Sequence, residues 1–146
     1  MKRDVSAIAA DLGRLRAADF EEGVPGADGM DLLRELCDEL LASGSVTHAA
    51  PLLFEFSERL DGAYLGSPGP IVHTLEKMPG YEPYLRESLR RKPTSLSLWM
   101  ANRIANAHRP DRAEWVGVLE AIASDPGVRP DVREDAASFV RHQRAA

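Results

Sequence analysis

Proline and glycine divide this chain into short segments, and most segments have the apolar spacing of a helix. The stretch of residues 66–106 shows the pattern best, because three short apolar stripes there are separated by Pro79-Gly80 and by Pro93. No segment alternates apolar and polar residues for long enough to predict a strand. We therefore expect an all-α protein.

The spacing of the apolar residues predicts about eight short helices. In chain order the stripes run from Val5 to Leu15, Met30 to Leu41, Leu52 to Leu60, Ile71 to Met78, Tyr81 to Leu89, Leu96 to Ala107, Trp115 to Ala123 and Val132 to Val140. We expect Gly44 to end the second helix. We expect Ser67 to cap the fourth helix, with Pro68 at its first position.

The length of the chain and its short connections limit how these helices can be arranged. A chain of 146 residues has the size of one domain, so we predict a single domain over residues 1–146. Short turns make consecutive helices antiparallel, and helices this short favour stacked hairpins over a four-helix bundle. The predicted architecture is an α-solenoid of the HEAT or armadillo kind.

Cys37 is the one cysteine of the chain, which excludes an intrachain disulfide and indicates a reducing compartment. Its place in an apolar stripe predicts a small core residue rather than a reactive thiol. There is no apolar run of about 18 residues, and the N-terminal residues lack the apolar core of a secretory signal. We therefore expect a cytoplasmic protein that does not bind a membrane.

The charge is acidic overall and unevenly distributed. The net charge is −5, with 13 acids and 6 bases in residues 1–61 but 10 acids and 12 bases in residues 62–146. The acidic half argues against nucleic-acid binding and suits a basic protein partner, although a merely solvated surface is an equally good interpretation. The candidate partner-binding acids are Asp31, Glu35, Asp38, Glu39, Glu55, Glu58 and Asp61.

Five polar residues lie among apolar ones in the stretch 66–106. They are His73, Glu76, Asn102, Arg103 and Asn106. His73 and Glu76 share a helix face but match no zinc motif, so we expect no metal, no cofactor and no enzyme activity. Arg103 falls on an apolar stripe, where a buried charge needs a partner, and Glu76 is the obvious candidate. We therefore expect a structural polar clasp rather than a catalytic site, with a binding surface as the alternative.

The segment RPDVREDAASFV resembles the second helix of a HEAT-type repeat. In that family, a turn ending in Asp leads into Val-Arg and then into two small residues on the buried side. The corresponding residues here are Asp131, Val132, Arg133, Ala136 and Ala137. The resemblance covers about a dozen residues and implies a helical-repeat fold without implying an activity.

Residues 66–106 resemble the α-helical-repeat immunity proteins of bacterial polymorphic-toxin and contact-dependent inhibition systems. The matching features are Val72-His73 with Glu76, then Pro93, then Trp99 with Arg103-Ile104 and Asn106. The resemblance covers roughly 40 residues and implies a protein that binds a cognate toxin domain, often a nuclease, and blocks it by occlusion. A helical-repeat adaptor with another protein partner is the alternative.

Overall fold

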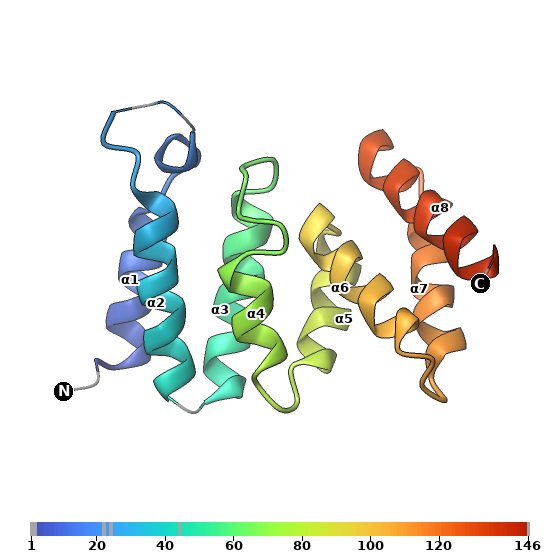
Figure 1. The fold of residues 1–146 in the computed structure, drawn as a ribbon, viewed down its shortest axis with the longest axis horizontal. Helices are drawn as coiled ribbons and strands as arrows, with labels where there is room; N and C mark the ends of the chain where they lie inside the picture. Colours follow the sequence, from blue (N-terminus) through green and yellow to red (C-terminus); the bar gives the residue numbers. More distant parts are fainter. Residues whose placement is uncertain (1–2, 22, 24, 44, 146) are drawn as a thin grey trace. The chain divides into compact units, whose positions relative to one another are not determined.

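The structure is a computed structural model that describes residues 3–21, 23, 25–43 and 45–145. Over these residues it has eight α-helices, one short 3₁₀ helix (η1) and no strand, which confirms the prediction of an all-α protein (Figure 1). The elements are α1 (Val5–Arg14), η1 (Ala17–Phe20), α2 (Gly29–Ser43), α3 (Val46–Arg59), α4 (Pro70–Glu76), α5 (Glu82–Arg91), α6 (Ser95–Asn106), α7 (Arg112–Ala123) and α8 (Pro130–Ala145). The predicted role of Gly44 lies outside the described residues.

The chain forms two compact units, Met1–Tyr84 and Leu85–Ala146, and the division falls inside α5. We call them unit 1 and unit 2 and describe each by itself. A single domain over the whole chain stays a prediction.

Unit 1 consists of two antiparallel hairpins, α1 with α2 and α3 with α4 (Figure 1). Helix α2 packs against α1, α3 and α4, so its apolar stripe lies at the centre of the unit. The fully buried side chains include Ile8, Leu33, Leu40, Leu53, Phe54, Ile71 and Leu75, each with no exposed surface. Each such leucine or isoleucine contributes about 1.5–3 kcal/mol to folding by leaving water.

The sequence patterns do not predict η1, the short helix that follows α1. Its Phe20 packs edge-on against Phe56 of α3, with 6.2 Å between ring centroids. The guanidinium of Arg59 lies over the Phe56 ring and donates hydrogen bonds of 2.9 Å to the backbone oxygens of Leu12 and Leu15. The Leu12 oxygen also accepts from the Leu15 amide, and Arg59 adds a hydrogen bond from α3 to each of these two carbonyls at the end of α1.

The start of α4 differs from the prediction. Ser67 is not the cap and Pro68 is not the first helical residue, because α4 begins at Pro70 with Gly69 before it. Gly69 has φ +89°, and a Cβ there would lie 2.1 Å from the backbone oxygen of Leu65. The tight turn thus requires glycine at this position, and Pro70, with its fixed φ, then begins the helix.

In unit 2, helices α6, α7 and α8 each pack against the other two. Thr94 caps α6, since its side chain accepts from the Ser97 amide at 3.1 Å while Ser97 Oγ accepts from the Thr94 amide at 2.9 Å. Trp115 is fully buried in α7, and its indole N–H donates to Asp111 at 3.1 Å. The guanidinium of Arg86 lies 4.3 Å from the centre of the Trp115 ring, which holds α5 to α7.

The close contact between η1 and α2 predicts a position that only glycine fits. A Cβ on Gly29 would lie 2.6 Å from the backbone oxygen of Asp19. We expect Gly29→Ala to lower the free energy of unfolding by about 1–3 kcal/mol, measured by urea denaturation of the whole chain. Gly13→Ala is the matched control, because Gly13 is also helical and has open space around it, so we expect a gain of about 0.5–1 kcal/mol. Equal effects of the two substitutions would contradict this account.

Candidate functional site

The seven predicted partner-binding acids do not lie in equivalent environments. Asp31, Glu35 and Asp38 are exposed and follow one another at helical spacing on α2, and Glu55 is exposed on α3. Glu58, in contrast, is buried with 7 % of its surface exposed, and Asp61 is half-buried. Of the seven, the α2 acids therefore form the most accessible group. We call Asp31, Glu35 and Asp38 the α2 acidic face.

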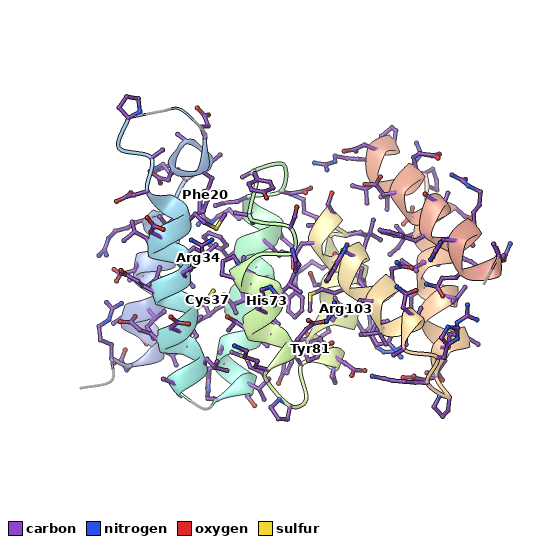
Figure 2. The ribbon with its side chains drawn as sticks, in the orientation of Figure 1. Phe20, Arg34, Cys37, His73, Tyr81 and Arg103 are labelled. Carbon is purple, nitrogen blue, oxygen red and sulfur yellow. The ribbon has the colours of Figure 1, made fainter. Side chains whose placement is uncertain are left out.

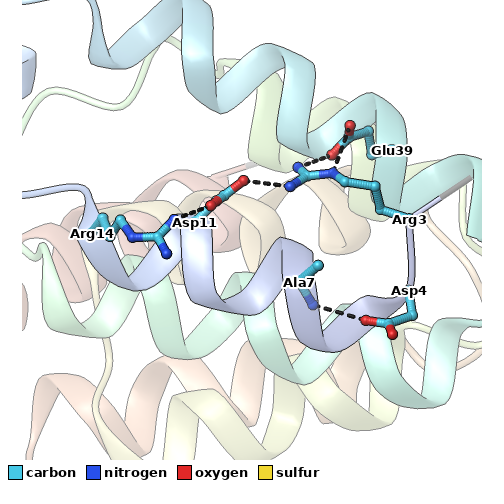
Figure 3. Close-up of polar contacts among 6 residues, drawn as sticks. All are labelled: Arg3, Asp4, Ala7, Asp11, Arg14 and Glu39. Carbon is cyan, nitrogen blue, oxygen red and sulfur yellow. Dashed lines mark hydrogen bonds and ion pairs between the residues drawn. The ribbon is translucent and has the colours of Figure 1, made fainter.

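Glu39 is already bound within the chain. Arg3 donates to the Glu39 carboxylate at 2.6 and 3.3 Å and to Asp11 at 2.6 Å, and Asp11 also pairs with Arg14 (Figure 3). The hydrogen bond from Arg3 lowers the pKa of Asp11. The hydrogen bonds to Glu39 and to Asp11 in turn raise the pKa of Arg3. Glu39 thus ties α2 to Arg3, two residues before the start of α1, so a partner would have to compete with Arg3 for it.

A groove of about 410 Å³ runs beside the α2 acidic face, between α1, η1 and α2. Glu35 and Leu32 of α2 line it, together with Leu15 and Asp19. Leu32 has 40 % of its surface exposed, which makes it one of two large hydrophobic side chains classed as exposed among the described residues. Arg3 and Arg14 also line it, so the groove offers an apolar contact with a charged rim in which carboxylates outnumber guanidinium groups, an arrangement found at protein interfaces.

Asn102 and Asn106 meet a residue that the sequence analysis did not single out. Gln143 of α8 donates from its side-chain nitrogen to Asn102 Oδ1 at 2.7 Å and to Asn106 Oδ1 at 2.6 Å. Arg112 of α7 donates to the side-chain oxygen of Gln143 at 2.9 Å and to its backbone oxygen at 2.6 Å. Gln143 is 2 % exposed, so these bonds form a mostly buried polar cluster joining α6, α7 and α8. No motif signals it, because Gln143 is a polar residue in a charged segment.

Arg103 is exposed, so the expectation that it lies buried on the apolar stripe of α6 is wrong. The buried residues of α6 cover two sides of the helix, and Arg103 projects between them toward Trp99, with its guanidinium 5.3 Å from the ring centre. Glu76 lies in unit 1 and Arg103 in unit 2. The Glu76–Arg103 pair therefore stays a prediction, and it no longer rests on a buried charge.

His73, Arg34 and Cys37 lie where α4 meets α2 (Figure 2). A groove of about 460 Å³ is lined there by Arg34 and Asp38 of α2 and by His73 and Lys77. His73 and Arg34 are exposed, whereas the Cys37 thiol is buried and burial raises its pKa to about 12. Among the described residues, no three His, Cys, Asp or Glu side chains gather as metal ligands would.

Comparisons with protein-family models, with curated proteins and with solved structures found no match to this chain. Over the described part of the chain, none of the helices combines the length and the apolar character needed to cross a membrane.

The polar cluster of unit 2 gives a prediction about stability. Gln143→Ala removes the donor to Asn102 and Asn106 and the acceptor of Arg112, and leaves buried polar atoms without these bonds. We expect the free energy of unfolding to fall by about 2–3 kcal/mol in urea denaturation. His142→Ala, at the exposed neighbouring position, should change it by less than about 0.5 kcal/mol. A Gln143→Ala protein as stable as the parent would show that the cluster contributes nothing to stability.

The buried thiol gives a prediction about reactivity. Cys37 is 1 % exposed and its pKa is raised to about 12. At pH 8 a reagent therefore cannot reach the sulfur in the folded chain, and very little of the thiol is in the reactive thiolate form. We expect an aromatic disulfide reagent to label it only as fast as the fold opens, and at once in denaturant. Ser6→Cys in a Cys37→Ala background is the control, because Ser6 is exposed on α1 and should be labelled within seconds. Equally fast labelling of native Cys37 would contradict its assignment to the core.

Proposed function

We propose that this chain is an immunity protein that binds a cognate bacterial toxin domain and neutralises it by occlusion, without catalysis. The observation that carries the proposal is the α2 acidic face beside the exposed Leu32, which together offer a charged rim and an apolar contact. The resemblance of residues 66–106 to immunity proteins supplies the class of partner. The proposal includes the cytoplasm as the place of action and a HEAT-like stacking of the helical hairpins.

The charge of unit 1 supports a basic partner. Residues 1–84 carry 15 acids and 7 bases, a net charge of −8, whereas residues 85–146 carry 8 acids and 11 bases, a net charge of +3. A field of this sign attracts a basic surface over a Debye length and raises the rate of association at low salt. Nucleases that bind the phosphates of nucleic acids present such a surface. A toxin nuclease is therefore the partner that this charge suits.

The surroundings of the candidate acids show which of them can take part in the proposed interface. Glu58 is buried and Glu39 is bound to Arg3, so neither supplies a carboxylate that is freely available to a partner. Glu35 and Asp38 are exposed, and each lines a groove, with Glu35 beside Leu32 and Asp38 beside His73. These two acids are the sharpest test of the proposed interface.

We expect the double variant Glu35→Gln, Asp38→Asn to slow association with the toxin on the order of tenfold at low salt and to flatten the salt dependence. The toxin is sought as the product of the adjacent upstream gene, by co-expression, pull-down and rescue of growth. Association rates are then measured by surface plasmon resonance. The matched control is Glu87→Gln, Asp135→Asn, which removes the same charge at exposed positions of unit 2.

Four outcomes decide the proposal. Rescue of growth, with slowed association in the unit 1 variant alone, supports both the function and the interface. Rescue with equal rates for both variants moves the interface away from the α2 acidic face. Binding of a protein without rescue identifies an adaptor, and neither binding nor rescue removes the immunity function.

A further inference from the structure

A third groove lies at the end of unit 1 where both hairpins reverse direction. Its volume is about 700 Å³, and it is lined by Ala17, Phe20 and Glu21 on one side and by residues 61–64 on the other. Figure 1 shows η1 and the loop after α3 at the same end of the unit. The residues of the Arg3, Asp11 and Glu39 cluster do not line this groove.

Tyr64 is the unusual residue of this groove. It has 58 % of its surface exposed, the highest value among the large hydrophobic side chains classed as exposed in the described residues. An aromatic side chain in a groove is the usual anchor of a binding site, because it offers a wide, stiff contact at a small entropic cost. Glu21, which is exposed, and Asp61, which is half-buried, line the same groove.

We infer that this groove binds an arginine side chain of a basic protein partner. A guanidinium is planar, so it stacks on a tyrosine ring while its N–H groups donate to neighbouring carboxylates. Tyr64 supplies the ring and Glu21 supplies an exposed carboxylate, while the half-buried Asp61 adds negative charge to the same groove. The identity of the partner rests on the proposed function, whereas the arginine subsite itself does not.

The walls of the groove are held before any ligand arrives. Phe20 is 9 % exposed and packs on Phe56, and Arg59, on the same helix as Phe56, is bonded to the end of α1. The residues that line the groove therefore lose little conformational entropy when a ligand binds. Tyr64 also lines the neighbouring groove, where Arg34 and Lys77 would repel a cation, so a guanidinium is favoured on the side of η1.

The test uses a short probe rather than the partner. The peptide acetyl-Gly-Arg-Gly-amide is titrated into the ¹⁵N-labelled whole chain, and amide and Tyr ring shifts are followed by NMR. We expect saturable shifts centred on Gly62, Ala63 and Tyr64. The same peptide with citrulline, which is neutral and of the same shape, should bind at least several-fold more weakly.

Variants of the chain distinguish the contribution of the Tyr64 ring to peptide binding from that of the overall negative charge. Tyr64→Ala should weaken binding of the arginine peptide by about two- to fivefold, whereas Tyr64→Phe should keep it. Glu21→Gln should weaken binding, and Glu55→Gln, on α3, is the matched charge control that should not. Thermal denaturation of each variant verifies that it is folded.

Shifts that centre on Leu32 and Glu35 instead, or equal affinity for the arginine and citrulline peptides, would overturn the inference. A toxin that binds the Tyr64→Ala chain as tightly as the parent would overturn it while leaving the proposed function intact. Binding of the arginine peptide at Tyr64 without any toxin partner would support the subsite while the proposed function fails.

Discussion

The two hydrogen bonds from Arg59 to the backbone of Leu12 and Leu15 fix how unit 1 is assembled. They hold the end of α1 to a helix 44 and 47 residues away in the chain, so α1 cannot slide along α3 without breaking both bonds. The same guanidinium covers Phe56, on which Phe20 rests. Arg59 thus supports η1 and one wall of the Tyr64 groove, together with the close packing of η1 on Gly29 of α2.

Unit 2 uses a related device that is centred on an uncharged side chain. Gln143 bonds to two asparagines of α6 and to Arg112 of α7, so one residue of α8 joins three helices. Leucine and tryptophan packing supplies most of the stability here, but apolar contacts tolerate sliding. Hydrogen bonds between buried amides have strict distances, so the cluster specifies one register of α8 against its neighbours.

The sequence predicted features that are encoded locally. The apolar stripes from Tyr81 to Leu89 and from Leu96 to Ala107 correspond to α5 and α6, because helical spacing can be followed within one segment. The predicted start of α4 was wrong because Ser67 and Pro68 are residue types that often begin a helix. The tight turn that requires glycine at position 69 cannot be inferred from the residue types alone. Arg103 was misplaced because one helical period cannot show that a helix is buried on two sides.

Features that depend on distant partners could not be predicted. Asn102 and Asn106 were recognised as structural candidates, but their partner lies 41 and 37 residues further along the chain. Among the candidate acids, spacing could not separate Glu58, which is buried, from Glu55, which is exposed three positions earlier. The exposed Tyr64 also escaped notice, because a tyrosine after a helix is ordinarily a core residue.

The place of Gln143 within α8 has a consequence for hydrogen exchange. The last turn of a helix normally frays, which lets its amide hydrogens exchange quickly with water. In α8 that turn carries Gln143, whose side chain and backbone oxygen are both held by Arg112. The amide hydrogens of this turn should therefore exchange together with the opening of the contact between α6 and α8, rather than by local fraying.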